Sequence, residues 1–295
     1  MKLALALILT TPVWCGSPAE PITPANVSRV KIAWIYDTGE SPNVFEAKPS
    51  HFEAMPAYAD GKLYLSTPAG LVIALDAETG REIWKRDLHV FRDWDYSEPT
   101  TRGVTLAGNI IYAATTDARL VCLNRSTGEP CSGFGTSGEV DLRAGLRHKP
   151  EYSGEYGVSS PPATYKDLVI TGSFVADNSR AKMASGEVRA FDAKTGALRW
   201  TYHPLPANSP AGAANTWSRI TVDDANGLVF LPTGSASPDY YGGLRPGDNR
   251  DANSIVVLKA ATGEIVWSFQ TVHHDIWITM SPRRRCFSRE RTAPP

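Results

Sequence analysis

Short apolar runs that end in a turn dominate the hydrophobic pattern of this chain. In the clearest example, residues 71–75 are apolar, residues 76–80 read Asp-Ala-Glu-Thr-Gly, and the chain then returns through Trp84. A short apolar run bounded by turn residues predicts a β-strand. We expect the Asp76 carboxylate to accept hydrogen bonds from the turn amides and Gly80 to adopt a positive φ. The pattern therefore predicts a β-hairpin whose return strand carries a tryptophan large enough to wedge between neighbouring sheets.

The same hairpin pattern returns three more times. The turn glycines are Gly80, Gly128, Gly196 and Gly263, which are 48, 68 and 67 residues apart. The second copy lacks the tryptophan. A further strand is expected before each hairpin, at residues 61–65, 108–112, 167–170 and 227–231. Repeats of this length with a strand–turn–strand signature predict an all-β fold, a β-propeller with about four blades in this chain.

Length and composition agree with one large all-β domain. The chain has 295 residues, 42% of them hydrophobic, and a formal net charge of −1. A charge so near zero gives no reason to expect a nucleic-acid partner or an anionic membrane surface. No interior apolar run approaches the roughly 20 residues of a membrane span.

Residues 1–19 differ from the rest of the chain. Met1 and Lys2 precede an apolar run at 3–9, and small and polar residues follow through position 19. This order predicts a secretory signal peptide and a periplasmic product, with a buried first strand as the alternative. Cys122 and Cys131 flank the second turn, where they are expected to form a disulfide or to remain two buried free thiols.

Several motifs between the strands carry a family resemblance. They are Thr101-Arg102-Gly103-Val104, Ser159-Ser160-Pro161-Pro162, Asn215-Thr216-Trp217 and the segment Gln-Thr-Val-His-His-Asp-Ile-Trp at 270–277. With the repeated hairpin, they make residues 30–277 resemble pyrroloquinoline quinone (PQQ)-dependent dehydrogenases, most closely the glucose, quinate and shikimate branch. The resemblance implies an eight-bladed propeller whose axial site holds the quinone and a calcium ion, or magnesium. It further implies a sugar or alcohol substrate and a respiratory electron acceptor.

The resemblance also assigns residues to the cofactor. Because PQQ carries three carboxylates on a flat aromatic frame, its site needs cations and a stacking surface. Arg102 matches the position that pairs with a cofactor carboxylate, for which a guanidinium fork is suited; the alternative is an exposed salt bridge. Trp217 matches the indole on which the quinone lies; the alternative is a core tryptophan between blades. Ser159 aligns with a polar residue near the cofactor.

A metal site is implied in the third and fourth blades. Asp177 and Asn178 match a metal-ligand position, and their carboxylate and amide oxygens are hard ligands of the kind that calcium takes; the alternative is an Asp-Asn turn. Ser237 falls where alcohol dehydrogenase relatives place another ligand, usually an asparagine. A hydroxyl is a poorer ligand than an amide oxygen.

The resemblance ends at Trp277. The family has an aspartate next, which removes the substrate hydroxyl proton, whereas this chain has Ile278, which has no group to accept a proton. The tail 278–295 holds five arginines and one glutamate. Loss of one G from TGG GAT TAC GAT GTC CC, a coding of Trp-Asp-Tyr-Asp-Val-Pro, gives Trp-Ile-Thr-Met-Ser-Pro, which is residues 277–282.

We therefore interpret residues 20–277 as about four blades of an eight-bladed quinoprotein propeller and residues 278–295 as a frameshifted basic tail; the alternative for the tail is an arginine-rich patch that binds anions. Negligible dehydrogenase activity is expected from the chain as written. Blade faces left uncovered by such a partial propeller favour self-association. The competing interpretation is a non-catalytic propeller that acts as a scaffold in the cell envelope.

Overall fold

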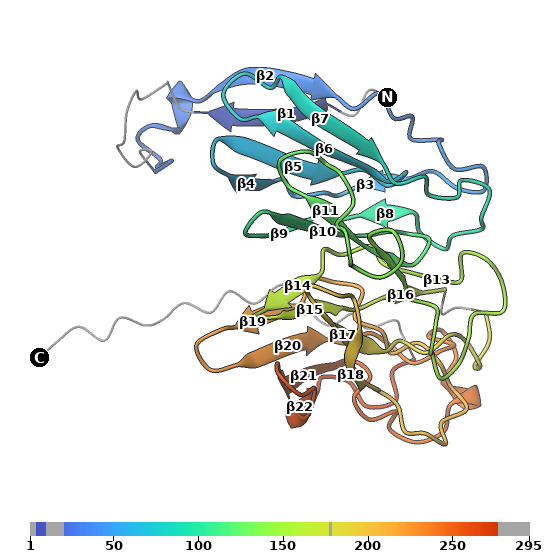
Figure 1. Cartoon of the computed structure of the whole chain (residues 1–295). Coiled ribbons are helices and arrows are strands. Elements are labelled where there is room, and N and C mark those ends of the chain that lie inside the picture. Colours follow the sequence, from blue (N-terminus) through green and yellow to red (C-terminus); the bar gives the residue numbers. More distant parts are fainter. Residues whose placement is uncertain (1–3, 10–20, 177–178, 277–295) are drawn as a thin grey trace, which may run out of the picture.

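The computed structural model describes residues 4–9, 21–176 and 179–276 (Figure 1). Within them, four four-stranded antiparallel sheets follow one another along the chain, and each strand pairs with the next one in its sheet. Figure 1 shows these sheets stacked in chain order, from the blue N-terminal sheet to the orange and red C-terminal one. The helical structure described is limited to two short 3-10 turns, η1 (Val27–Arg29) and η2 (Gly242–Leu244). The predicted all-β propeller fold is confirmed.

Each blade is a meander of four strands. Blade 1 comprises β4 (Ala57–Ala59), β5 (Lys62–Ser66), β6 (Leu71–Asp76) and β7 (Glu82–Asp87). Blade 2 comprises β9 (Thr105–Ala107), β10 (Ile110–Ala114), β11 (Arg119–Asn124) and β12 (Glu139–Asp141). Blade 3 comprises β14 (Ala163–Tyr165), β15 (Leu168–Thr171), β17 (Val188–Asp192) and β18 (Leu198–Tyr202). Blade 4 comprises β19 (Thr221–Asp223), β20 (Leu228–Pro232), β21 (Ser254–Lys259) and β22 (Ile265–Gln270).

Three two-stranded pairs accompany the blades. Short strands β3 (His51–Phe52) and β8 (Thr100–Thr101) pair in parallel, and β13 (Tyr156–Gly157) pairs antiparallel with β16 (Phe174–Val175). In the third pair, β1 (Ala4–Leu9) lies antiparallel to β2 (Lys31–Asp37). Part of the predicted signal peptide thus forms a strand, as in the alternative interpretation, while residues 10–20 lie outside the described part; the export signal stays a prediction.

Alternation along β6 shows why its sequence is apolar throughout. Val72 and Ala74 belong to a buried cluster shared with blade 2, whereas Ile73 and Leu75 belong to one that includes Trp34 of β2. Successive side chains of a strand point to opposite faces. Blade 1 is therefore buried on both faces, and its core lies in the layers between neighbouring sheets.

The turn chemistry follows the prediction. The Asp76 carboxylate accepts hydrogen bonds from the Thr79 amide at 2.8 Å and from the Thr79 hydroxyl at 2.7 Å, and Gly80 has a φ of 72°. These hydrogen bonds hold the pKa of Asp76 below its ordinary value. Asn124 and Asp192 accept turn amides in the same way in the next two blades.

Tryptophans join consecutive sheets. Trp34 donates its indole N–H to the Ala77 carbonyl at 3.1 Å, and a Cβ added to Gly80 would lie 2.4 Å from the indole ring. The glycine is therefore needed for the close approach as well as for the turn. The same contact recurs with Trp84 on Arg125 and Gly128, and with Trp200 on Ala260 and Gly263.

Blade 2 replaces the missing tryptophan with two residues. Tyr112 donates its hydroxyl to the Ala193 carbonyl at 2.5 Å, and Val140 lies against Gly196. The outer strand β12 begins only at Glu139, whereas β7 of blade 1 begins at Glu82, soon after its turn glycine. The disulfide Cys122–Cys131 encloses the turn, and residues 132–138 follow it before the chain returns in β12.

Removing this disulfide is expected to lower the free energy of unfolding by about 2–3 kcal/mol, because the bond closes a short loop in the unfolded chain. The test is urea denaturation of the Cys122→Ser/Cys131→Ser variant beside the oxidised protein. Reductant should destabilise the natural sequence and leave the double variant unaffected. A difference below about 0.5 kcal/mol would contradict the expected contribution.

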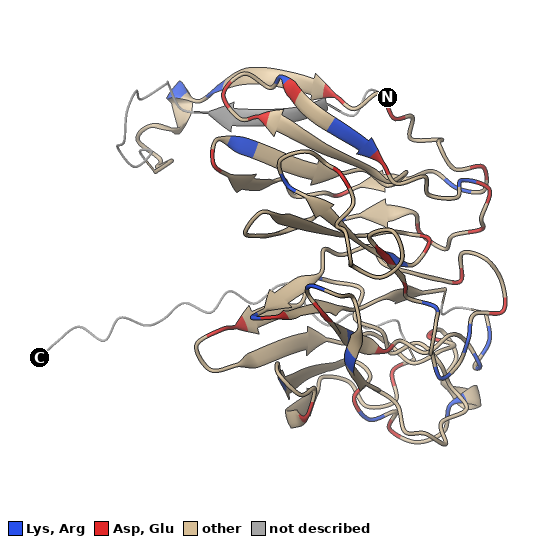
Figure 2. Ribbon diagram, in the orientation of Figure 1, with Lys and Arg blue, Asp and Glu red and all other residues tan. Residues whose placement is uncertain are grey.

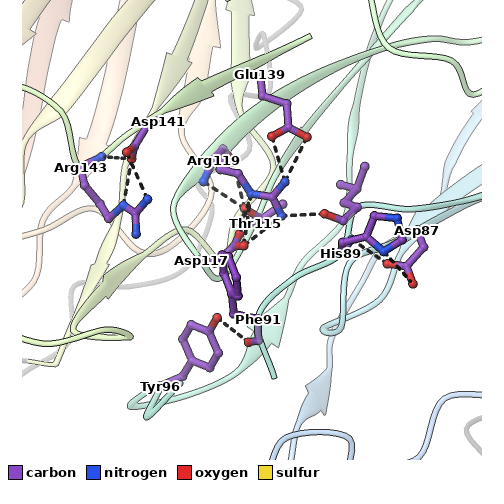
Figure 3. A network of polar contacts seen from close by, with 11 residues as sticks. Asp87, His89, Phe91, Tyr96, Thr115, Asp117, Arg119, Glu139, Asp141 and Arg143 are labelled. Atoms are coloured by element: carbon purple, nitrogen blue, oxygen red, sulfur yellow. Dashed lines mark hydrogen bonds and ion pairs between the residues drawn. The ribbon is translucent and has the colours of Figure 1, made fainter. Parts of the chain in front are cut away.

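A buried ion network ties blade 2 to the end of blade 1 (Figure 3). Arg119 contacts the Asp117 carboxylate at 2.9 Å and the Glu139 carboxylate at 2.9 Å, and it donates to the Leu88 carbonyl at 2.7 Å. The Asp117 side chain is fully buried. Since buried charges are costly unless paired, this network depends on all its members.

Charged residues elsewhere gather in loops and at strand ends, while most strand interiors are uncharged (Figure 2). In the part of the chain that the structure describes, no helix is long and apolar enough to cross a membrane.

Candidate functional site

Three residues that the sequence assigned to the cofactor meet in the structure. Arg102, directly after β8, donates from Nη1 to the Ser159 hydroxyl at 2.6 Å, and its backbone N–H donates to the Ser159 carbonyl at 2.8 Å. Its guanidinium carbon lies 4.9 Å from the centroid of the Trp217 ring. A cation, a flat aromatic surface and a hydroxyl are thereby placed side by side.

Backbone and apolar contacts fix the position of Trp217. Its carbonyl accepts the Ser160 hydroxyl at 2.6 Å and the Ser159 hydroxyl at 3.3 Å. Its partly buried ring packs against a cluster that includes Tyr96 and Phe174. Trp217 precedes β19 and is not on an outer strand, so it differs in place from the tryptophans that join the blades.

Arg102 also makes the salt bridge that was considered as its alternative role. Its Nη2 lies 3.0 Å from the Glu53 carboxylate, and the side chains are 18% and 47% exposed, respectively. Ion pairs with a solvent-exposed partner contribute little to stability. An anionic ligand can therefore compete with Glu53 for this guanidinium.

Three buried polar atoms near this group have no hydrogen-bond partner in the structure: Ser173 Oγ, Asn215 Oδ1 and Thr216 Oγ1. Hydrogen bonds connect these residues: the Ser173 N–H donates to the Thr216 carbonyl at 3.0 Å, and the Asn215 side chain donates from Nδ2 to the Ser173 carbonyl at 2.9 Å. Buried polar atoms are rarely left unpaired without a ligand or water. Together with Arg102 and Trp217, these atoms fit a flat ligand with several oxygen atoms, as PQQ is.

The metal prediction can be followed only in part. Asp177 and Asn178 lie outside the described residues. The chain on both sides of them is anchored on the buried Glu155, whose carbonyl accepts the Ala176 N–H at 2.9 Å. The Glu155 carboxylate accepts from Arg180 Nη2 at 2.6 Å and from the Ala184 N–H at 2.7 Å. No motif in the sequence indicates Glu155.

Ser237 makes backbone contacts with its hydroxyl. The fully buried Oγ donates to the Ala181 carbonyl at 2.6 Å and accepts the Gly212 N–H at 3.0 Å. These contacts hold the insertion of blade 3 against blade 4, so a structural role accounts for the residue; its coordination of a metal stays a prediction. Among the residues described, no three His, Cys, Asp or Glu side chains gather as a metal site.

A second polar cluster, in blade 4, was also missed by the sequence analysis. The Asp275 carboxylate is buried and accepts the Ser235 hydroxyl at 2.6 Å and Asn253 Nδ2 at 3.2 Å. The buried Arg245 donates to the Asp275 carbonyl and, at 3.0 Å, to the Pro238 carbonyl. Asp275 stands in the quoted 270–277 motif, but the motif does not reveal its burial. These bonds fix the chain just before Trp277.

Glu187 joins blade 3 to the long connection that precedes it. Its buried carboxylate lies 3.1 Å from His203 Nδ1 and accepts the Arg147 N–H at 2.9 Å. These residues line a pocket together with His148. Burial by itself would raise the pKa of Glu187, but the hydrogen bonds from His203 and from the Arg147 amide outweigh it and hold the pKa below 4.5.

The stability that Glu187 contributes should therefore depend on pH. Because its pKa is lower in the folded state than in the unfolded state, its contribution is complete above the ordinary value of 4.5 and is lost as pH falls through the folded pKa. We expect Glu187→Gln to lower the free energy of unfolding by about 1–3 kcal/mol at pH 6, with a smaller difference near pH 3. Urea denaturation at a series of pH values tests this, and a pH-independent difference would contradict it.

In this all-β propeller a guanidinium, an indole and unpaired buried polar atoms lie together, and their chemistry suits a flat, anionic ligand. A family model agrees: the PQQ model described as "Glucose/ethanol/alcohol dehydrogenase, beta-propeller domain" matches residues 17–279. The chain belongs to this family.

The curated relatives of this chain are dehydrogenases. The chain is 33% identical to the quinoprotein glucose dehydrogenase of Escherichia coli (strain K12), with 88% of this chain and 36% of the relative covered. It is 31% identical to the glycerol dehydrogenase large subunit of Gluconobacter oxydans (strain 621H), covering 88% and 38%. It is 32% identical to the quinate/shikimate dehydrogenase (quinone) of Acinetobacter baylyi, covering 85% and 35%. The chain thus spans little more than a third of the length of these relatives.

Solved structures show the same fold. The quinohemoprotein alcohol dehydrogenase from Comamonas testosteroni is 25% identical with a TM-score of 0.69, and the match covers 79% of this chain and 37% of that one. A europium-containing methanol dehydrogenase has a TM-score of 0.70 at 20% identity, covering 90% and 48%. The second similarity concerns the fold alone.

Proposed function

We propose that this chain binds PQQ as part of a quinoprotein dehydrogenase whose substrate is a sugar or a cyclic polyol. The observation that carries the proposal is the placement of the Arg102 guanidinium over Trp217 and on the Ser159 hydroxyl. The motifs resembling glucose, quinate and shikimate dehydrogenases, together with relatives of those names, support the substrate class.

Each residue has a stated task in the proposal. Arg102 pairs with a cofactor carboxylate, and Trp217 stacks on the flat ring system. The unpaired hydroxyls of Ser173 and Thr216 donate hydrogen bonds to its oxygen atoms. Asp177 and Asn178 supply hard oxygen ligands for calcium, with magnesium as the alternative ion. When bound, the quinone supplies the acceptor for the two electrons removed from the substrate.

The residue at position 278 affects catalysis but not our assignment of the quinone-binding residues. Where the family resemblance places an aspartate, Ile278 has no group that takes the substrate hydroxyl proton. We therefore propose that this chain binds the quinone but has negligible dehydrogenase activity.

We place this function outside the cytoplasm, in the periplasm, with a respiratory chain component as the electron acceptor of an active relative. The Cys122–Cys131 disulfide supports an oxidising compartment. The apolar segment 3–9 behind Lys2 supports export.

Equilibrium dialysis of the protein against PQQ, with and without calcium, tests the proposal. Arg102→Met should weaken PQQ binding by about 10–100-fold, because a charge-assisted hydrogen bond contributes about 1.5–3 kcal/mol. The matched control is Arg86→Met, which removes a partly exposed arginine paired with the exposed Glu129. Equal PQQ affinity in both variants, or no saturable binding by the natural sequence, would refute the assignment and favour the scaffold interpretation.

A further inference from the structure

Residues 159–162, which read Ser-Ser-Pro-Pro, connect two parts of the candidate site. On one side, the Arg102 N–H donates to the Ser159 carbonyl at 2.8 Å. On the other side, the Ser159 and Ser160 hydroxyls both donate to the Trp217 carbonyl. The segment is therefore bonded both to the residue that supplies the guanidinium and to the residue that supplies the indole.

The backbone of this segment is restricted by its sequence and by a further hydrogen bond. Because the residue before a proline is biased towards extended conformations, Pro161 limits the backbone of Ser160. The Thr105 hydroxyl, from β9, donates to the Pro162 carbonyl. Ser160 is only 8% exposed. Its hydroxyl therefore projects from a backbone that is held on both sides.

The backbone hydrogen bonds of the segment before β19 stop short of Trp217. The Asn215 carbonyl accepts the Gly234 N–H at 2.9 Å, and the Thr216 carbonyl accepts the Ser173 N–H at 3.0 Å. Within the described residues, no backbone N–H donates to the Trp217 carbonyl. The carbonyl of the residue that carries the indole is therefore held by side chains.

Ser160 makes the shorter of the two hydrogen bonds to this carbonyl. Its hydroxyl lies 2.6 Å from the Trp217 oxygen, compared with 3.3 Å for the Ser159 hydroxyl. The Ser159 hydroxyl also accepts a hydrogen bond from Arg102 Nη1 at 2.6 Å. A carboxylate that binds Arg102 competes with Ser159 for the guanidinium, whereas the contact of Ser160 is unaffected. Ser160 is therefore the anchor of Trp217 that does not depend on Arg102.

We propose that Ser160 is a positioning residue for the quinone: through the Trp217 carbonyl, its hydroxyl holds the indole beside the Arg102 guanidinium before the cofactor binds. The guanidinium carbon already lies 4.9 Å from the centroid of the indole ring. A site held in its binding geometry in advance avoids part of the cost of ordering side chains on binding. The inference rests on the proposed function, which is PQQ binding at Arg102 and Trp217.

Equilibrium dialysis against PQQ tests the positioning role. Ser160→Ala should weaken PQQ binding by about 3–10-fold, because it removes a buried hydrogen bond that orients the stacking surface. Ser160→Thr keeps the hydroxyl and should retain the natural affinity. The matched control is Tyr112→Phe, which removes a hydroxyl that donates to the Ala193 carbonyl at 2.5 Å, at the junction of blades 2 and 3. Its PQQ affinity should equal that of the natural sequence.

A double variant distinguishes positioning from a direct contact with the ligand. Trp217→Ala removes the indole, so Ser160→Ala should cause no further loss of PQQ affinity in the Trp217→Ala background. Additive losses would mean that Ser160 acts on the ligand by another route, and the positioning role would be wrong.

Fluorine NMR of the free chain tests the same role without the quinone. The chain is labelled with fluorotryptophan, and the Trp217 resonance is the one that Trp217→Phe lacks. Ser160→Ala should shift this resonance, and Tyr112→Phe should leave it in place. A Trp217 resonance that is the same in Ser160→Ala and the natural sequence would contradict the inference.

The dialysis results separate this inference from the proposed function. Absence of saturable PQQ binding by the natural sequence would refute both. Weaker binding by Arg102→Met with natural affinity in Ser160→Ala would support the proposed function and overturn only the positioning role. Urea denaturation confirms that each variant is folded, and Ser160→Cys, whose thiol is a weaker donor, provides a second variant that should also weaken binding.

Discussion

Replacing Arg119 by methionine is expected to lower the free energy of unfolding by about 3–5 kcal/mol. The substitution keeps much of the aliphatic volume but leaves the fully buried Asp117 carboxylate without the guanidinium that lies 2.9 Å away. Removing one partner of a buried ion pair has a large cost, because the remaining charge stays in a poorly solvated site. The bond to the Leu88 carbonyl, which joins blade 2 to blade 1, is lost as well.

Urea denaturation followed by tryptophan fluorescence measures this effect. Arg125→Met is the matched control, because Arg125 forms an ion pair of 2.6 Å with Asp60, a residue whose side chain is 76% exposed. An exposed pair of this kind contributes up to about 1 kcal/mol. Similar losses in the two variants would show that burial of Asp117 does not determine the cost.

A comparable loss, about 3–5 kcal/mol, is expected for Trp200→Ala. The indole is 8% exposed, belongs to the cluster between blades 3 and 4, and donates to the Ala260 carbonyl at 3.1 Å. Its removal leaves a cavity at the junction and an unpaired carbonyl. Trp267→Ala offers the same chemical change at the equivalent position of blade 4.

Because Trp267 is 46% exposed, its replacement should cost the isolated chain less than about 1 kcal/mol. The two variants can be compared by thermal and urea denaturation under identical conditions. Equal destabilisation would mean that Trp267 is as well packed as Trp200, which would contradict this expectation.

The blades could be predicted because their determinants are local. Asp76, Thr79 and Gly80 fold their own turn, so the repeat reveals the hairpins without knowledge of the neighbours. The packing of the second blade on the third could not be predicted, for the opposite reason. Tyr112 replaces the missing tryptophan through a contact with Ala193, which is 81 residues away, and no local pattern announces it.

In the candidate site, too, some residues could be predicted from the sequence and others could not. Motifs indicated Arg102, Ser159 and Trp217, and the structure brings these three together. The unpaired atoms of Ser173 and Thr216 were not predicted, since burial of a hydroxyl without a partner is a property of the packed chain and not of its sequence. The metal ligands Asp177 and Asn178 remain a prediction.

Because the blades stack in chain order, their order also affects which blade unfolds first. Among the described residues, three core clusters each join four-stranded sheets that are neighbours in the sequence, as in a linear array of repeats. In such arrays, unfolding begins at an end whose outer interface is missing, and inner units persist longer. Amide hydrogens of β21 and β22 should therefore exchange with solvent sooner than those of β10 and β15.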